Sequence, residues 1–568
     1  MKARPYSILF SILLLTFTMT SCGGSGSVDE PSRGETSSIY ENSPPPKETP
    51  ASRGTSRPVP RDEQGPDPFG FINDFFNPDL IAANGAGIGH VCPLPWNMLM
   101  PDGVNFDDEQ LARFDAWVRN NHDNGLEVFI RLRSGGYSGS DGFTAIPDVE
   151  DWPIDTTDYS LPPHNGYKDG EWVGSVVKGK AYPPKVLTLD TPGNTSPWYD
   201  YVYALASRYN GTTPDPERPN EVLPKIKYWA LDGEEEMTGR WYGSATDLYG
   251  GVGGDSDVGT LPSFYRAVHA ANPDAKVVGG NLLDPSVLIY IVHEMMRDRG
   301  GYDNELLQYT RDWLGQHKVL QLPFVNVAAL RHKMESPEHT RFRGFVEHLL
   351  DANKYYDILG YHMYSTYEYL PDVIRFYRDK MAEHGFSKPL WGSETGIIES
   401  PVPNPGHEIQ AQRLIKLLTI SLAEGVQHVT YSGMIYDPVN FLYINGLYSP
   451  NLILFRGALT PEQVNQRFGY VSRESFAFFA HTIKGRGYQF DRMITQGDDE
   501  FYVFRSGTTN SMFCVAWSDG EEASFDPRRE LGMPSSAQLD LYDYRGHLLE
   551  PMSDVDLSGE PVFLEWYE

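Results

Sequence analysis

Short apolar segments alternate with segments of helical periodicity over most of this 568-residue chain. A clear helical segment is 106–124, in which Leu111, Phe114, Trp117 and Val118 recur at the three- and four-residue spacing of one helix face. Where strands and helices alternate, each helix carries the chain back to the start of a neighbouring parallel strand. The alternation therefore predicts an α/β fold built on a parallel sheet.

Eight of the apolar segments have the length of a strand. They are Phe69–Ile72, Ala86–Leu94, Leu126–Arg133, Ile226–Leu231, Val277–Gly280, Asp357–Tyr364, Lys388–Gly396 and His428–Gly433. Eight strands that alternate with helices close into a (β/α)8 barrel, or TIM barrel. We expect this barrel to occupy residues 66–484.

The pattern changes after Gly485, where helical periodicity gives way to short apolar runs separated by turns such as Asp519-Gly520. The runs are Phe501–Phe504, Met512–Trp517, Leu539–Tyr544 and Pro561–Leu564, to which Tyr488–Met493 can be added. Short strands with closely spaced turns are typical of a β-sandwich. We therefore expect a small C-terminal β-sandwich over residues 485–568.

The first 65 residues have the character of a targeting signal and a tether. Lys2 and Arg4 precede an apolar run over 7–19, which is too short to cross a bilayer comfortably and ends just before Cys22. This arrangement resembles a bacterial lipoprotein signal, in which the cysteine is lipidated, although a plain secretory signal is the alternative. Residues 23–65 are rich in Ser, Gly, Pro and Glu and cannot bury a core. We expect a signal over 1–22, a disordered tether over 23–65, and a location in the bacterial cell envelope with membrane contact through the lipid only.

The composition limits the classes of partner. A net charge of −30 argues against nucleic-acid binding, which requires a basic face. Eleven Trp and 34 Tyr suit a protein that stacks aromatic rings on sugars, although a large aromatic core would use them too. No Cys/His spacing indicates a zinc site, and the chemistry inferred below requires neither a metal nor an organic cofactor. The oligomeric state is left open.

Two of the strand-length segments end in carboxylates. The segment that begins at Ile226 runs into Glu234, Glu235 and Glu236, and the segment over 388–396 contains Glu394. The carboxyl ends of barrel strands form the face on which active sites are built. One acid that protonates a leaving oxygen and a second that attacks carbon are the requirements of glycoside hydrolysis. Solvated loop acids would look the same individually, so the assignment depends on the surrounding pattern.

This pattern resembles the retaining (β/α)8 glycoside hydrolases of clan A, a superfamily with many cellulases, mannanases and β-xylosidases. In that clan a Trp-x-x-x-Asn-Glu motif ends strand four, and Trp229-Ala-Leu-Asp-Gly-Glu234 matches it except at the Asn. The resemblance implies that Glu234 is the acid/base and that Glu394, at the end of strand seven, is the nucleophile. It also implies cleavage of β-glycosidic bonds in a poly- or oligosaccharide by double displacement, with the two carboxyl groups about 5–5.5 Å apart.

The resemblance implies further residues that contact the substrate or the nucleophile. Strand six of the clan commonly ends in His-x-Tyr, which His362 and Tyr364 match. Trp391 belongs to the Lys-Pro-x-Trp start of strand seven, Tyr431 is the nearest equivalent of an aromatic residue on strand eight, and Trp96 follows strand two.

The chain also departs from the clan. Gly233 replaces the Asn before the acid/base, and a shift of one position would make Glu235 the acid. The Arg that is common on strand two is absent, with His90 and Val91 near its place. At Gly233 the missing amide is either supplied elsewhere, absent, or replaced by room for a bulkier 2-substituent on the sugar. The alternative for the whole protein is a non-catalytic carbohydrate-binding surface lipoprotein on a degenerate barrel.

Overall fold

The computed structural model describes the chain from residue 66 onward with several gaps. The described ranges are 66–72, 78–100, 105–134, 167–168, 171–172, 195–231, 233–236, 244–250, 258–316, 326–364, 367–397, 406–432, 460–520, 523–550 and 554–567. Cys22, the expected signal over 1–22 and the expected tether over 23–65 all lie outside them. Within these ranges no helix combines the length and the apolar character needed to cross a membrane.

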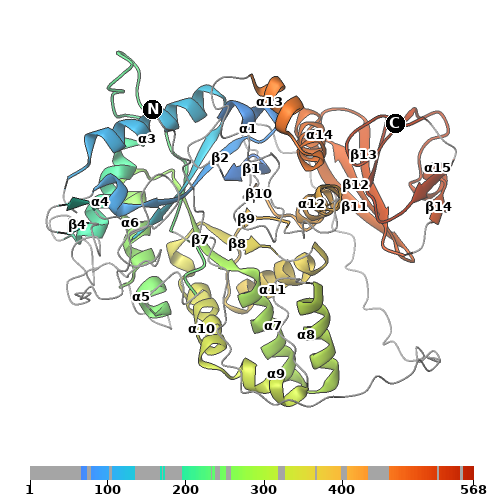
Figure 1. Cartoon of the computed structure of the whole chain (residues 1–568), viewed down its shortest axis with the longest axis horizontal. Coiled ribbons are helices and arrows are strands. Elements are labelled where there is room, and N and C mark those ends of the chain that lie inside the picture. The colour runs from blue at the N-terminus through green and yellow to red at the C-terminus, as the bar shows by residue number, and fades with distance from the viewer. Residues whose placement is uncertain are drawn as a thin grey trace, which may run out of the picture. The chain divides into compact units, whose positions relative to one another are not determined.

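Eight parallel strands close into a barrel in the order β1-β10-β9-β8-β7-β6-β3-β2 (Figure 1). Their bounds are β1 Phe69–Ile72, β2 Ile88–Pro95, β3 Glu127–Arg133, β6 Tyr228–Leu231, β7 Lys276–Leu283, β8 Ile358–Met363, β9 Leu390–Thr395 and β10 His428–Tyr431. All eight predicted segments are confirmed as barrel strands, which differ from the prediction mainly at their ends. The chain therefore folds as the expected TIM barrel.

Helices surround the barrel strands (Figure 1). They are α1 Pro78–Ala83, α2 Trp96–Leu99, α3 Asp108–Asp123, α4 Pro197–Arg208, α5 Ala245–Tyr249, α6 Thr260–Ala271, α7 Asp284–Arg299, α8 Asn304–Gln316, α9 Val327–Met334, α10 Pro337–Asp351, α11 Leu370–Glu383, α12 Gly406–Ala423, α13 Pro461–Phe468 and α14 Val471–Gly485. Short 3-10 turns occupy Asn353–Tyr355 (η2) and Tyr367–Tyr369 (η3), and β4 Tyr167–Lys168 pairs with β5 Glu171–Trp172.

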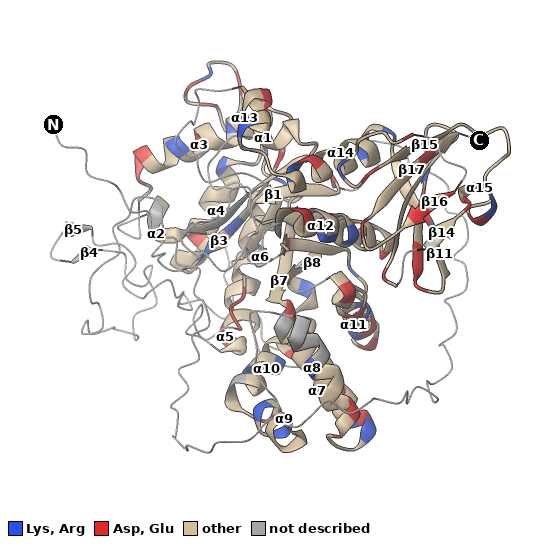
Figure 2. Cartoon of the chain, turned by 45° about the vertical axis from the view of Figure 1, so that its right-hand side comes forward, with Lys and Arg blue, Asp and Glu red and all other residues tan. Residues whose placement is uncertain are grey.

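Side-chain caps explain where several of these helices begin. Asp107 accepts a hydrogen bond from Gln110 N at the start of α3, and Ser196 accepts one from Tyr199 N at the start of α4. Such caps satisfy backbone N–H groups that have no partner within the first turn. On the outer helices the basic residues lie interspersed with the acidic ones (Figure 2).

The lower interior of the barrel is apolar. It is filled by Ile88, Phe129, Tyr228, Ala230, Val278, Ile358 and Trp391. Packing of this kind makes the centre of the barrel a core rather than a pore. Two buried histidines pack there as well, His90 against Phe129 and His428 against Trp391.

The C-terminal region forms a five-stranded antiparallel sheet in the order β11-β12-β13-β17-β15, together with a two-stranded sheet, β14-β16. The bounds are β11 Tyr488–Gln496, β12 Asp499–Ser506, β13 Ser511–Ser518, β14 Ala523–Phe525, β15 Leu539–Tyr542, β16 Val555–Leu557 and β17 Val562–Tyr567, with a short helix α15 at Pro527–Glu530. The expected β-sandwich is confirmed, although β14 and β16 were not predicted.

The five-stranded sheet is buried on both faces. One face shares a core with Phe525 of β14 and Leu557 of β16. The other face packs against α14, where the ring centroids of Phe479 and Phe563 are 6.2 Å apart and those of Phe478 and Phe563 are 5.1 Å apart. The barrel helices and the C-terminal sheet therefore share one continuous apolar core.

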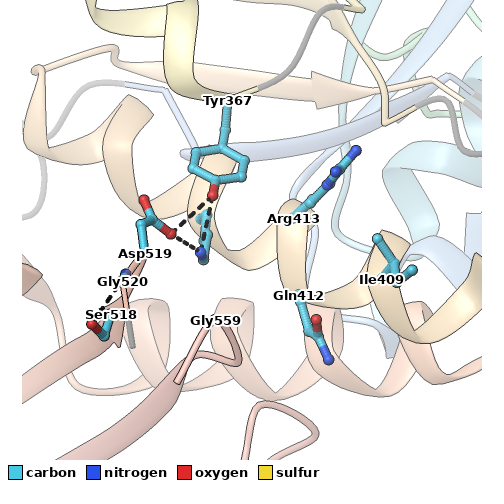
Figure 3. Close-up of a pocket in the computed structure, with 9 residues that line it drawn as sticks. Tyr367, Ile409, Gln412, Arg413, Ser518, Asp519, Gly520 and Gly559 are labelled. Carbon is cyan, nitrogen blue, oxygen red and sulfur yellow. Dashed lines mark hydrogen bonds and ion pairs between the residues drawn. The ribbon is translucent and has the colours of Figure 1, made fainter. Parts of the chain in front are cut away.

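A polar contact also joins α12 to this sheet. Lys416 Nζ lies 2.7 Å from Asp519 Oδ1 and 2.9 Å from the hydroxyl of Tyr367 in η3. Beside this contact is a cavity of about 260 Å³, lined in part by Gln412 and Arg413 of α12 (Figure 3).

Candidate active site

Three of the predicted site residues meet at the carboxyl ends of β6, β8 and β9. A carboxylate oxygen of Glu234, a carboxylate oxygen of Glu394 and a ring nitrogen of His362 all lie within 4.8 Å of one another. Glu234 and His362 are buried, whereas the side chain of Glu394 is 14% exposed. The structure thus brings the two predicted catalytic acids together from strands that are far apart in the sequence.

Arg131, on β3, connects the members of this cluster. Its Nη2 donates to Glu394 Oε2 at 2.5 Å, and its Nη1 lies 2.6 Å from His362 Nε2. Because a guanidinium group can only donate, His362 Nε2 must accept, and the ring proton is then on Nδ1. That nitrogen lies 3.1 Å from Glu234 Oε1 and donates to it. His362 therefore links the cation to the second acid in a single tautomer.

Tyr364 holds the other oxygen of Glu394. Its hydroxyl donates to Glu394 Oε1 and also lies 2.6 Å from Ser432 Oγ. Burial and the negative charge of Glu394 raise the pKa of Tyr364 well above its usual value. The phenol therefore keeps its proton over the physiological pH range and can act as a donor to the carboxylate.

The space next to the Cα atom of Gly233 is filled by the side chains of other residues. A methyl group added at Gly233 would collide with His362 Cε1 and would lie 2.9 Å from His362 Nε2 and 3.1 Å from Arg131 Nη1. The place that an Asn side chain would need is therefore occupied by the His362–Arg131 pair. All three alternatives for how the 2-position of the sugar is contacted stay predictions.

The three successive acids after β6 point to different surroundings. Glu234 faces Glu394. Burial raises the pKa of Tyr249 in α5 well above its usual value, and the negative charges of Glu235 and Glu236 act in the same direction. Glu236 Oε1 accepts hydrogen bonds from Leu283 N at 2.8 Å and from Ser286 Oγ at 2.9 Å. Of these acids, the geometry favours Glu234 rather than Glu235 as the partner of Glu394.

Glu236 is an unusual carboxyl group. It is fully buried, and its Oε2 atom has no hydrogen-bond partner among the described residues. Burial is the main cause that raises its pKa to about 7, while the negative charge of Glu234 acts in the same direction. Glu236 is therefore a buried carboxyl group with a raised pKa, two residues after the candidate acid/base Glu234.

The turn that carries these acids is held by backbone contacts. Glu234 has a φ of 64°, which is uncommon for a residue with a side chain, and its N–H donates to Asn281 O at 3.0 Å. Arg341 of α10 donates from Nε to Glu236 O and from Nη2 to Glu235 O, both at 2.9 Å. These contacts fix the backbone that aims Glu234 at Glu394.

Three aromatic residues that we expected to bind substrate lie elsewhere. Trp96 packs against Trp198 and Tyr201, with ring centroids 5.5 Å from each. Trp391 packs in the lower barrel, and the hydroxyl of Tyr431 accepts from Gln410 Nε2 at 3.1 Å. All three are fully buried, so none has a ring face left for a sugar, and the structure corrects this part of the expectation.

Two residues of the site, Arg131 and Ser432, were not predicted from the sequence. The signal for Arg131 was present, because it is an arginine inside the apolar segment 126–133, where a buried cation needs an acidic partner. Ser432 follows directly after β10 and gave no comparable signal.

Glu234, His362 and Glu394 have the donor types and spacing of a metal site. However, Arg131 already donates to Glu394 and to His362 Nε2. A metal ion there would face a guanidinium group that carries the same sign of charge and already uses these ligand atoms. The guanidinium group of Arg131 therefore takes the place that a metal ion would have beside these ligand atoms.

Comparisons with known proteins find similar folds only. No protein-family model matches the chain, and no curated protein matches its sequence. Similar solved structures include a family 39 glycoside hydrolase from the gut symbiont Bacteroides cellulosilyticus WH2, with 14% identity, a TM-score of 0.49 and coverage of 89% of this chain and 82% of that chain. A family 30 endoxylanase from Clostridium papyrosolvens C71 has 11% identity, a TM-score of 0.44 and coverage of 89% and 97%. Likenesses this distant carry no argument about activity.

Proposed function

We propose that this protein is a retaining glycoside hydrolase that cleaves β-glycosidic bonds of a poly- or oligosaccharide. The observation that carries the proposal is the pair Glu234 and Glu394, whose carboxylate oxygens lie within 4.8 Å across the carboxyl end of the barrel. Retaining enzymes hold their two carboxyl groups close together, whereas inverting enzymes leave room for a water molecule between them. The short separation therefore favours a double displacement.

The surroundings of the two acids divide the roles between them. Arg131 and Tyr364 both donate to Glu394 and so hold its two oxygens in place, as a nucleophile requires. Two carboxylates this close repel each other, so the pair retains a proton, which then belongs to Glu234. Glu394 is accordingly the nucleophile, and Glu234 is the general acid.

In the first step Glu394 attacks the anomeric carbon while Glu234 gives its proton to the glycosidic oxygen. The bond to the leaving sugar breaks, that sugar departs as an alcohol, and a glycosyl ester forms on Glu394. In the second step Glu234, now a carboxylate, takes a proton from water as the water oxygen attacks the anomeric carbon. Glu394 is released and Glu234 is protonated again, so the configuration at carbon is retained.

The test uses three variants of the full chain. Glu394→Gln is expected to abolish turnover with the melting temperature little changed. Glu234→Ala is expected to be rescued by azide on an activated aryl glycoside, with a β-configured azide product. Glu235→Ala serves as the matched control and should show no such rescue. Proton NMR of the first-formed sugar distinguishes the mechanisms, because an inverted anomer would exclude double displacement.

The sugar and the linkage are found by a screen. Plant and algal polysaccharides are incubated with the wild-type protein and with Glu394→Gln, and the products are analysed by chromatography. Products that appear only with the wild-type protein support the proposal. Binding without products in every case would favour the non-catalytic alternative.

A further inference from the structure

The backbone carbonyl of Asn281 helps to hold the turn at Glu234, and its side chain, which has no role so far, contacts the strand ends that carry both acids. It is the residue of β7 that falls between Gly280, which pairs with Gly360, and Leu282, which pairs with Tyr361. Two steps along β7 thus match one step along β8, so Asn281 is the extra residue of a β-bulge. Its φ of 58° and its nearly complete burial are both uncommon for an Asn inside a strand.

On one side Asn281 holds the strand end that leads to Glu234. Its carbonyl oxygen accepts from Glu234 N at 3.0 Å, and its Nδ2 donates to Leu231 O at 3.3 Å. A carbonyl oxygen can only accept, so this contact also fixes the orientation of the amide. The Oδ1 atom of Asn281 must then point the other way.

On the other side Asn281 reaches the strand that carries Glu394. Ser393 Oγ donates to Asn281 Oδ1 at 2.6 Å, and Ser393 immediately precedes Glu394. β8 lies between β7 and β9, so this bond passes over a strand. Gly360 of β8 makes the passage possible, because a methyl group there would collide with Asn281 Oδ1 and lie 2.9 Å from Ser393 Oγ.

We propose that Asn281 is a positioning residue that sets the relation between Glu234 and Glu394, acting through Leu231 and Ser393 across Gly360. Its amide and its carbonyl together bridge the fourth, fifth and seventh strands of the barrel. Bulges commonly re-aim side chains next to active sites, and a displacement of about 1 Å at a reacting group can cost about a hundredfold in rate. This proposal rests on the proposed function, since it assigns a role in the same reaction.

The hydrogen bonds of Asn281 to Leu231 and Ser393 are called the bridge below. Two variants disturb this bridge in independent ways. Asn281→Gly removes the amide but retains the carbonyl oxygen and suits the positive φ, so it should fold without backbone strain. Gly360→Ala leaves Asn281 intact and places a methyl group in its path. Ser475→Ala is the control, because it removes a buried polar contact, the hydrogen bond from Ser475 Oγ to Val471 O at 3.1 Å, in α14, which carries none of these residues.

The first measurement compares phenyl and 2,4-dinitrophenyl β-glycosides of glucose, xylose, mannose and galactose. A dinitrophenolate leaves without a proton, whereas a phenolate needs the general acid, so a misplaced Glu234 slows the phenyl glycoside selectively. We expect the ratio of the two kcat values to change by roughly tenfold or more in Asn281→Gly and Gly360→Ala and to stay constant in Ser475→Ala. A loss of folded protein would lower both rates equally. An unchanged ratio in both bridge variants would overturn the proposal.

The second measurement needs no sugar. Glu234 and Glu394 are modified with a water-soluble carbodiimide and glycine ethyl ester over a range of pH, and the modified peptides are quantified by mass spectrometry. We expect the pH dependence of labelling to shift in both bridge variants and not in Ser475→Ala, because the repulsion between the carboxylates depends on their separation. If the wild-type protein cleaves none of the glycosides, this profile alone decides the proposal for Asn281: a shift supports it and identical profiles overturn it. The proposed function itself is contradicted only if the polysaccharide screen yields no products either.

Discussion

At the scale of single residues, replacing Arg131 should disturb the contacts of both acids. It donates to Glu394 directly and to Glu234 through His362. We expect Arg131→Met to lower kcat by roughly a hundredfold or more, because a buried charge-assisted pair is broken beside the nucleophile. Steady-state kinetics of the variant and the wild-type protein measure the loss, and an unchanged kcat would contradict this role.

Gly233 offers a second test at this scale. Because a methyl group there would collide with His362, we expect Gly233→Ala to displace the ring and to lower kcat by roughly tenfold to a hundredfold. Gly344→Ala on α10 is the control, since an added methyl group there meets nothing within 4 Å. Steady-state kinetics of the two variants make the comparison. Equal activity in both would show that His362 can move without consequence.

Glu236 should make the stability of the fold depend on pH. Its pKa is raised from 4.5 to about 7, so the folded protein keeps a proton that the unfolded chain releases above pH 4.5. The unfolded state then binds fewer protons, and stability falls as the pH rises from about 4.5 through 7. The full shift corresponds to roughly 3 kcal/mol at most.

The neutral isostere Glu236→Gln should lack this dependence. It can accept the same bonds from Leu283 N and Ser286 Oγ without a charge. The melting temperature of the wild-type protein, measured relative to Glu236→Gln, should therefore decline from about pH 4.5 to about pH 7 and level off above that value. Parallel pH curves for the two proteins would be the contrary result.

At the scale of elements, the contact between α12 and the C-terminal sheet depends on Lys416. Burial lowers the pKa of this lysine, and the hydrogen bond and charge of Asp519 oppose that effect. The ammonium group also lies 4.8 Å from the ring centroid of Tyr367 and 5.1 Å from that of Trp517. We expect Lys416→Met to destabilise the fold by roughly 1–3 kcal/mol, because Asp519 is left with no cation at this contact.

A double-mutant cycle isolates this contact. Lys416→Met, Asp519→Asn and the combined variant are unfolded in urea and followed by tryptophan fluorescence. A coupling of about 1 kcal/mol is expected for a charged pair of which one member is buried. Strictly additive effects would mean that the pair adds nothing to the junction.

The elements were predictable from the sequence to a greater extent than the site. Each barrel strand is a short apolar run, and the acids that end β6 and β9 are visible as a break in that run, so the fold and Glu234 with Glu394 could be inferred. Trp391 and Tyr431 were misassigned because an aromatic side chain on a strand looks the same whether it packs or binds. The bulge at Asn281 depends on how β7 aligns with β8, which no local pattern contains.

At the scale of the whole molecule, the expected lipid anchor gives the last prediction. If Cys22 is the lipidated residue, mass spectrometry of the mature protein should find a diacylglyceryl cysteine at its N-terminus. Cys22→Ser should shift the protein from the membrane fraction to the soluble fraction, because stable attachment would require the lipid. An unmodified mature N-terminus elsewhere in the chain would contradict the anchor and favour the plain secretory signal.

The apolar core shared by α14 and the C-terminal sheet has a consequence for how this protein can be recombined. Accessory β-domains joined by a linker can be exchanged between enzymes because few contacts cross the boundary. Here Phe478 and Phe479 of α14 pack against Phe563 of β17, and a cut between barrel and sheet would expose aromatic surface on both pieces. A chimera that grafts this barrel onto a foreign domain would need α14 to be redesigned, so the two parts have to be transferred together.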